Sequence, residues 1–404
     1  MVNTDSPASW QERHENVKSE EYGPRAASLG LSLRGFILIP LFILIALSIL
    51  FLGHYFIYAS ALYFFGITAF EHRAALVAVL FVLPVSFIVA SFLAHWYDSL
   101  VIRVLYFCSS LWLGVGLTLL TAFGFAWAAW GAACVLVHSP DPVWFGLAAV
   151  GIALVYSVYG VANALRPRIV SFTVRLNNLP PGWRGKKLVQ VSDVHLGQIL
   201  GAKFLARAVA KANAQNPAMV LITGDLFDGA DGNLEQLVAP LNSLIAPLGV
   251  YFVTGNHETY LGVERAFAAL RTTPVRVLAD ECVLIDGLQV VGISYPDRGH
   301  ALDFAGKMAK LPGFDPALPS ILLYHSPSQV AQAKAAGINL QLSGHVHQGQ
   351  LFPLQFITRL IFGTYYHGLH TEGNYNLYTT SGAGVWGPTM RTGNHPEIVV
   401  IQLE

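Results

Sequence analysis

Charged residues are scarce in this chain. Only 12% of its 404 residues are Asp, Glu, Lys or Arg, about half the share that is usual in soluble domains. Basic and acidic residues are equal in number, 24 of each, so the formal net charge is zero. A chain without an excess of positive charge lacks the electrostatic footprint of nucleic-acid binding. We therefore expect no nucleic-acid partner.

Cysteine is also scarce, with Cys108, Cys134 and Cys282 as the three in the sequence. Two of them lie in long apolar runs and the third stands alone. This spacing excludes a disulfide framework and a zinc site built from cysteines. The composition fits a reducing compartment.

Long apolar runs, in contrast, are abundant, and 54% of the residues are hydrophobic. A helix needs about 20 apolar residues to cross a bilayer, and four successive runs approach or exceed this length, at 36–70, 74–94, 104–127 and 143–165. Buried helices of a soluble core would not recur in this way. The sequence therefore predicts an all-α transmembrane domain of about four helices over residues 35–166, preceded by a polar N-terminal tail at 1–34.

Basic residues between the runs indicate an orientation. Most of them fall on one side of the predicted spans: Arg13, Lys18, Arg25, Arg34, Arg103, Arg166 and Arg168. The loops on the other side carry only Arg73. Because basic loops stay in the cytoplasm, we expect an integral protein of the bacterial inner membrane whose termini and C-terminal domain are cytoplasmic.

The pattern of hydrophobic residues changes after the fourth apolar run. Short apolar strands alternate with helical stretches, which is typical of an α/β domain, here at 167–404. The predicted strands are 172–174, 186–193, 218–223, 250–254, 282–285, 288–293, 321–324, 338–342, 377–380 and 397–402. The predicted helices are 202–213, 234–245, 263–270 and 328–336.

Five of these strands end in polar side chains of the types that bind metals. In chain order they are Asp193 and His195; Asp225 and Asp228; Asn256 and His257; His325; and His345 and His347. A single such residue could be a cap or a turn residue. Ligands in open α/β sheets bind beyond the carboxyl ends of the strands, so the recurrence favours one shared site.

The candidate ligands are carboxylates, an amide and imidazoles, without a thiolate. This set favours Mn, Fe or Zn, with manganese as our first choice. The ligands are too many for one ion, and two divalent ions about 3.5–4 Å apart would use them by sharing a carboxylate. Such a pair activates a water molecule and stabilises an in-line displacement, so a phosphoester is the natural substrate.

Five motifs carry a resemblance to a known family. They read Asp193-Val-His195, Gly224-Asp-Leu-Phe-Asp228, Gly255-Asn-His-Glu258, His325 and Gly344-His-Val-His347. In this order they resemble the motifs of the calcineurin-like metallophosphoesterases. The sequence of the segment Gly382–Pro388 resembles that of the YkuE/YaeI-like branch of this family. The resemblance implies a four-layer αββα sandwich, two β-sheets flanked by helices, over residues 170–404.

The resemblance also implies a role for each residue. Asp193, His195, Asp225 and His347 would hold one metal ion, and Asp225, Asn256, His325 and His345 the other, with Asp225 bridging. His257 would contact the phosphate as the catalytic residue that protonates the leaving oxygen. Asp228 and Glu258 would orient the ligands.

An apolar stretch, Phe352–Phe362, follows the last motif. It is either a packed loop or core helix, or an amphipathic rim that dips into the membrane interface. In the second interpretation the substrate rim consists of Phe352, Phe356, Arg359, Tyr365, His367 and His370.

The membrane helices and this rim favour one substrate class. We expect hydrolysis of a phosphodiester or pyrophosphate of a lipid or lipid-linked substrate, by attack of a metal-activated hydroxide. A membrane-tethered general phosphodiesterase for soluble or nucleotide substrates is the first alternative. A non-catalytic membrane scaffold and a transporter with a regulatory domain are the others. The sequence makes no prediction of the oligomeric state.

Overall fold

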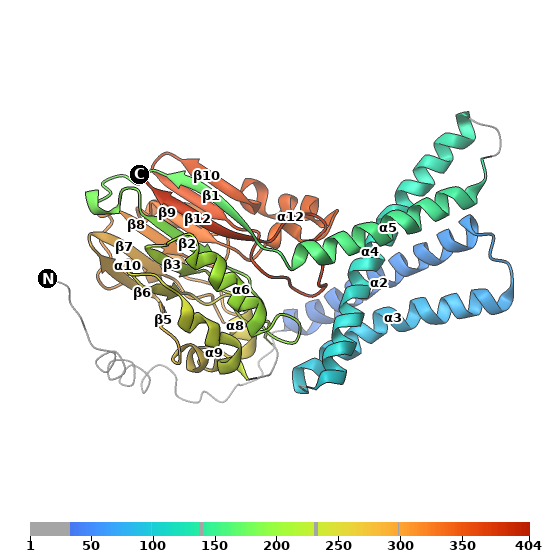
Figure 1. The fold of residues 1–404 in the computed structure, drawn as a ribbon, viewed down its shortest axis with the longest axis horizontal. Coiled ribbons are helices and arrows are strands. Elements are labelled where there is room, and N and C mark those ends of the chain that lie inside the picture. The colour runs from blue at the N-terminus through green and yellow to red at the C-terminus, as the bar shows by residue number, and fades with distance from the viewer. Residues whose placement is uncertain (1–32, 98, 137–139, 230–232, 298) are drawn as a thin grey trace. The chain divides into compact units, whose positions relative to one another are not determined.

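Four long apolar helices come first in the chain. The computed structural model describes residues 33–97, 99–136, 140–229, 233–297 and 299–404. The helices are α2 (Leu33–Phe64), α3 (Phe70–Trp96), α4 (Leu100–Leu136) and α5 (Pro142–Ala164) (Figure 1). Each is long and apolar enough to cross a membrane. The prediction of about four apolar helices is confirmed, whereas the predicted tail at 1–34 lies almost wholly outside the described residues.

The break between the first two helices lies earlier than the sequence indicated. Glu71, His72 and Arg73 read as the interruption, but they occupy the first turn of α3. The chain turns instead at Gly66, which has a φ of 60°. A carboxylate in a first helical turn is favoured by the helix dipole, so Glu71 begins a helix rather than ending one.

By its internal contacts the chain divides into residues 1–52 and 53–404, and the domain boundaries at 34 and 166 stay a prediction. The described part of the first unit is a segment of α2 with exposed apolar side chains such as Leu44 and Ile49. Within the second unit, polar side chains join the apolar helices. Trp127 Nε1 donates to Ser60 Oγ over 2.9 Å, and hydrogen bonds of this kind stabilise helix pairs in apolar surroundings.

The first β-sheet has six strands. Their order is β1 (Arg168–Val174), β12 (Glu397–Leu403), β2 (Lys187–Val191), β3 (Met219–Ile222), β4 (Val250–Phe252) and β5 (Val275–Val277). Strands β2 to β5 run parallel to one another. Strand β12 is antiparallel to β2 and parallel to β1. The carboxyl ends of β2, β3 and β4 therefore share one edge.

The second sheet also has six strands. Their order is β10 (Gly368–Glu372), β11 (Tyr375–Thr379), β9 (Leu340–Ser343), β8 (Ser320–Leu323), β7 (Leu288–Gly292) and β6 (Glu281–Ile285). Strands β11, β9, β8 and β7 are parallel, and the outer strands β10 and β6 are antiparallel to their neighbours. This sheet contributes the carboxyl ends of β8 and β9.

Shorter helices complete the domain. They are α6 (Ala202–Asn213), α7 (Leu234–Val238), α8 (Asn256–Leu261), α9 (Val263–Leu270), α10 (Phe304–Ala309), α11 (Val330–Ala335) and α12 (Leu354–Phe362). Short 3-10 turns lie at Pro181–Trp183, Ala239–Ser243, His347–Gly349 and Gly363–Tyr366. The helix predicted over 234–245 is α7 followed by the second of these turns, because Pro240 cannot donate the hydrogen bond that would continue α7.

Alternating side chains along the strands build the layers. In β2, Leu188 packs between the two sheets with Val290 of β7, whereas Val189 and Val191 face the layer that contains α6. This is the two-residue period of a strand buried on both faces. Helices α10 and α11 cover the far face of the second sheet through Phe304 and Ala333. The result is the predicted helix–sheet–sheet–helix sandwich (Figure 1).

Candidate metal centre

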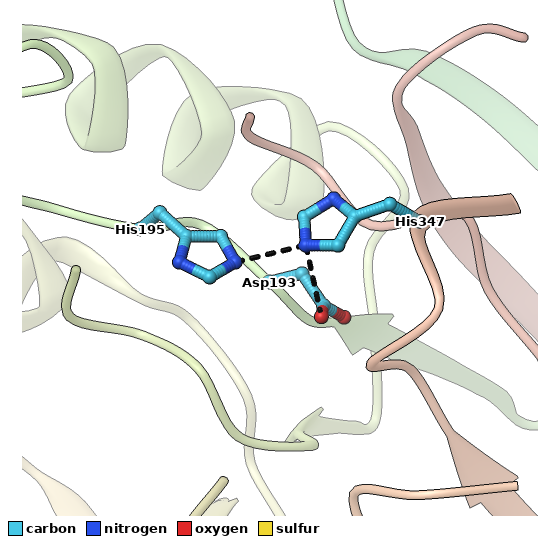
Figure 2. A group of neighbouring side chains, drawn as sticks. All are labelled: Asp193, His195 and His347. Carbon is cyan, nitrogen blue, oxygen red and sulfur yellow. Dashed lines mark hydrogen bonds and ion pairs between the residues drawn. The ribbon is translucent and has the colours of Figure 1, made fainter. Parts of the chain in front are cut away.

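Polar side chains from both sheets meet at the carboxyl ends of the parallel strands. Three residues form a first cluster, Asp193 and His195 after β2 and His347 after β9 (Figure 2). His195 Nε2 lies 2.9 Å from His347 Nε2. The same His347 Nε2 atom lies 3.5 Å from Asp193 Oδ1. All three residues are buried, and one ligand atom from each lies within 4.8 Å of the others. This grouping could hold one metal ion.

A second cluster lies beside the first. It joins Asp225 after β3, His325 after β8 and His345 after β9, again with ligand atoms within 4.8 Å of one another. His325 Nε2 is 3.1 Å from Asp225 Oδ2. His345 Nδ1 is 2.8 Å from the side-chain oxygen of Asn256. A carboxylate, an amide oxygen and two imidazoles therefore converge here.

Asp225 links the two clusters. Its Oδ2 atom, 3.1 Å from His325 Nε2, is also 3.9 Å from His195 Nε2 in the first cluster. The side chain is buried, so its charge is shielded from water. One carboxylate placed between two ligand groups is the arrangement that a pair of ions sharing a ligand requires.

The backbone at these positions is strained. Asp193, His195, Asp225, His345 and His347 have φ values of 52°, 53°, 51°, 73° and 46°. Residues other than glycine seldom adopt a positive φ, and such strain gathers at functional sites. The left-handed conformation turns the chain sharply after its strand.

Two glycines allow the loops to approach one another closely. A Cβ atom on Gly255 would lie 2.1 Å from Asp225 Oδ1. A Cβ atom on Gly344 would lie 2.0 Å from Asp193 Oδ2. Any other residue at either position would push a carboxylate out of its cluster.

Asp193 Oδ2 is buried and has no hydrogen-bond partner. An unpaired carboxylate oxygen in the interior is costly, and burial raises the pKa of Asp193. A divalent cation beside it would reverse this penalty. The buried carboxylates and converging imidazoles therefore fit divalent metal ions.

Glu258 supports the loop that carries Asp225. Its carboxylate accepts hydrogen bonds from the backbone N–H groups of Gly255 (2.6 Å), Asp225 (3.0 Å), Leu226 (2.9 Å) and Phe227 (3.1 Å). Burial raises the pKa of Glu258 to about 7, and the nearby Asp225 carboxylate contributes to the shift. The side chain thus joins the loop after β3 to the start of α8.

His257 lies beside the first cluster. Its ring centroid is 4.6 Å from that of His195, and its backbone N–H donates to Asp225 Oδ1 over 2.9 Å. Burial lowers the pKa of His257, and the neighbouring His195 lowers it further. In the neutral ring, Nδ1–H donates to the backbone carbonyl of Asp228 over 2.9 Å, so Nε2 carries the lone pair that can take up a proton.

The six predicted rim residues have other partners. Within the described residues, no hydrogen bond, ion pair or ring contact joins them to either cluster. Tyr365 donates to Glu372, His367 Nε2 lies 3.6 Å from Glu397 and His370 bonds the His367 carbonyl. Arg359 stacks over Tyr366, and Phe352 packs against Phe356. Their role in substrate binding stays a prediction.

Four aromatic residues that the sequence did not single out surround the imidazoles. Phe362 and Tyr295 have ring centroids 6.2 Å and 6.0 Å from His345. Tyr260 and Trp386 lie 5.3 Å and 6.0 Å from His257. Tyr260 lies two residues after the Gly255–Glu258 motif, which was the signal available for it, whereas Tyr295 lies far from any motif. Next to Tyr260 and Tyr295 is an open pocket of about 570 Å³, lined by Thr259, Tyr260, Tyr295, Pro296, Asp297, Gly299 and His300.

Two loops that carry or support the clusters touch the apolar helices. Gln198, which follows His195, donates to the carbonyl of Ala94 near the end of α3 over 3.4 Å. Asn163, in the last turn of α5, donates to the carbonyl of Arg391 over 2.9 Å. The clusters therefore lie close to the C-terminal ends of α3 and α5.

Comparison with known proteins gives consistent matches. The family described as Calcineurin-like phosphoesterase matches residues 186–349. A Helicobacter pylori metallophosphoesterase is 35% identical over 59% of this chain and 64% of its own length. A transmembrane protein with metallophosphoesterase domain from Danio rerio is 35% identical over 63% of this chain and 61% of its own. For Bacillus subtilis YkuE, the identity is 31% over 64% of this chain and 94% of the relative. The chain thus spans less than two thirds of the length of the Helicobacter pylori and Danio rerio relatives.

Proposed function

The chain belongs to the calcineurin-like metallophosphoesterase family, and from this premise we propose that it is a membrane-bound phosphoesterase with two divalent metal ions. The family and the clustered Asp and His side chains suggest a dinuclear divalent site. The proposed substrate is a phosphodiester or pyrophosphate of a lipid or lipid-linked molecule.

The two clusters supply the proposed ligands. Asp193, His195, Asp225 and His347 would hold one ion, and Asp225, Asn256, His325 and His345 the other, with manganese as the first choice. When bound, such a pair supplies positive charge for the phosphoryl oxygens and lowers the pKa of water. The free Oδ2 of Asp193 and the position of Asp225 between the clusters support this assignment.

His257 is the proposed catalytic acid. The Asp228 carbonyl holds its Nδ1–H, which leaves Nε2 as the atom that exchanges a proton with the leaving oxygen. A proton taken up at Nε2 turns the ring into an imidazolium, and the lowered pKa of this buried ring makes that proton easy to release to the leaving oxygen. Glu258 orients the Asp225 loop through four backbone N–H groups.

The contacts of the site loops with the ends of α3 and α5 are the observation that carries the lipid proposal. Helix α12 adds to it, because none of its nine residues is buried. Leu360 and Ile361 are 85% and 69% exposed, and an apolar helix face of this kind fits a membrane interface. Phe362 at its end contacts His345, so an inserted α12 would bring lipid headgroups to the clusters.

The orientation is also part of the proposal. The ends of α3 and α5 that touch the site loops lie on the side of the membrane that carries the basic residues Arg103, Arg166 and Arg168. We place that side in the cytoplasm of a bacterial cell by the positive-inside rule.

A general phosphodiesterase for soluble substrates is the second candidate. The pocket beside Tyr260 and Tyr295 is open and includes Asp297 and His300. These polar side chains suit a soluble leaving group, such as a nucleoside, better than an acyl chain.

A substrate panel tests both candidates. Full-length protein in detergent micelles with Mn, Fe or Zn would receive a long-chain phosphodiester lipid, a lipid pyrophosphate, a nucleotide diester and bis(p-nitrophenyl) phosphate. We expect kcat/KM for a lipid to exceed that for the soluble esters at least about tenfold. Equal values would overturn the lipid proposal, and no hydrolysis with any metal would overturn the enzyme and favour a scaffold.

A further inference from the structure

Arg391 is a buried guanidinium with an unusual set of partners. It lies in the segment between β11 and β12 and is fully buried. Its Nε donates to the Gly384 carbonyl over 2.9 Å and its Nη2 to the Ser381 carbonyl over 2.7 Å. Its Nη1 donates to the side-chain oxygen of Asn394 over 2.7 Å. A buried charge is normally paired with an opposite charge, but these partners are neutral.

The guanidinium also contacts His347. Arg391 Nη2 lies 3.1 Å from His347 Nδ1, whereas Nε2 of the same ring faces His195 and Asp193. Asn394 holds the backbone of the same residue, since its Nδ2 donates to the His347 carbonyl over 2.6 Å. Arg391 and Asn394 therefore fix both the ring and the main chain of His347 from the side opposite the cluster.

The other side of this segment is bound to α5. Asn163 Nδ2 donates to the carbonyls of Arg391 (2.9 Å) and Asn394 (2.7 Å). Asn163 Oδ1 accepts from His395 Nδ1 over 2.6 Å. The amide is buried, and all its contacts go to one segment, so its orientation is fixed.

The backbone of α5 contacts the same segment. The Arg391 N–H donates to the Gly160 carbonyl over 2.9 Å. A Cβ atom on Gly160 would lie 2.4 Å from Met390 Cγ, so only glycine permits this approach. Tyr156 Oη donates to the Thr392 carbonyl over 2.5 Å. Three residues spaced one turn apart on α5 thus hold residues 390–394.

From these contacts we propose that Asn163 and Arg391 are positioning residues that couple the last membrane helix to the metal ligand His347. The helix bundle is then part of the support of the active site as well as an anchor. This inference rests on the proposed function, because it takes His347 as a ligand. Groups behind a ligating histidine commonly change metal affinity by about 10–100-fold when they are removed.

The test measures metal binding by the full-length protein in detergent micelles. Asn163→Asp keeps the acceptor for His395 but removes both donated hydrogen bonds. Arg391→Lys keeps the charge but loses the planar fork that reaches His347 and Asn394 together. Ser157→Ala is the matched control. Ser157 lies on α5 like Asn163, and its loss removes a buried hydrogen bond to Thr118 of α4 without touching the segment.

We expect the dissociation constant for Mn²⁺ to rise at least about tenfold in Asn163→Asp and Arg391→Lys and to stay within about twofold in Ser157→Ala. The absorption spectrum of the Co²⁺-loaded protein should change in the first two variants only. A purely structural role would lower the melting temperature without moving the spectrum. Should Asn163→Asp fail to fold, Arg391→Lys alone decides the outcome.

The results separate this inference from the proposed function. If the parent protein binds no divalent metal, both are wrong. If the parent binds metal and hydrolyses phosphoesters while both variants keep its affinity and spectrum, only the coupling is overturned.

Discussion

Five Asp and His residues that follow strands have a backbone conformation that is rare for residues other than glycine. Asp193, His195, Asp225, His345 and His347 all have positive φ values. The hydrogen bond from the His345 N–H to Asp193 Oδ1, at 2.8 Å, joins the loops of the two sheets. Such contacts offset the cost of the strained backbone and hold the side chains in place before any ion binds.

Replacing His257 by Gln tests its proposed role at the residue scale. We expect kcat to fall about 100-fold, the scale of general acid catalysis, because Gln cannot release a proton. The metal content should not change. His72→Gln, at an exposed position in the first turn of α3, is the control and should keep the parent's kcat. Metal loss in His257→Gln would show that His257 is a ligand instead.

Glu397 predicts a pH dependence of stability. Burial alone would raise its pKa, but the contact with His367 and hydrogen bonds from Thr380 (2.8 Å) and the Ser381 N–H (3.1 Å) lower it. A carboxylate with a lowered pKa stabilises the folded state above its unfolded pKa of about 4.3. This contribution is lost as the pH falls through the folded value.

We therefore expect Glu397→Gln to reduce the unfolding free energy by about 1–3 kcal/mol at pH 7 and by less at pH 3.5. Denaturant titrations of parent and variant at both pH values measure the difference. A destabilisation that is equal at the two pH values would contradict the assignment.

At the scale of elements, strands with strong apolar runs were predicted well and weak ones were missed. Helix α6 has its predicted bounds, and β2, β3 and β9 lie inside the predicted ranges or within one residue of them. Strand β5 has only three residues. Strand β10 is an exposed edge strand without an apolar face. Both depend on pairing with neighbouring strands, which local sequence does not reveal.

Helix α12 allows a test of membrane contact. We expect Leu360→Gln with Ile361→Gln to lower the turnover of a micellar lipid phosphodiester about tenfold, because the loss of buried apolar area weakens insertion. Hydrolysis of bis(p-nitrophenyl) phosphate should not change. Ile245→Gln is the control, since Ile245 is 67% exposed but lies outside α12. An equal loss for both substrates would instead indicate a folding defect.

At the scale of the molecule, the two clusters draw on both sheets, and loops near them contact two apolar helices, α3 and α5. Its ligand groups come from β2, β3 and β4 on one sheet and β8 and β9 on the other, so bound ions would tie the sheets together. At an ion concentration 100 times the dissociation constant, binding of the ion to one site raises the free energy of unfolding by about 2.7 kcal/mol.

We therefore expect a chelator to lower the melting temperature of the full-length protein by about 5–10 °C, and Mn²⁺ to restore it. Differential scanning fluorimetry measures the shift. Asp193→Asn, which lacks a full carboxylate in the first cluster, should show a smaller response to the chelator. A parent protein that melts at the same temperature with and without chelator would contradict the dinuclear site.

The sequence by itself determined the four apolar helices, the α/β character of residues 167–404 and the candidate ligands, because hydrophobic period and residue chemistry are local properties. Only the tertiary structure decided that Asp225 lies between two clusters, that Phe362 and Trp386 flank the imidazoles, and that Arg391 and Asn163 stand behind His347. Contacts of this kind join residues far apart in the chain, as in the hydrogen bond between Asn163 and His395, 232 positions apart. They arise from strand order and loop approach, which no local pattern encodes.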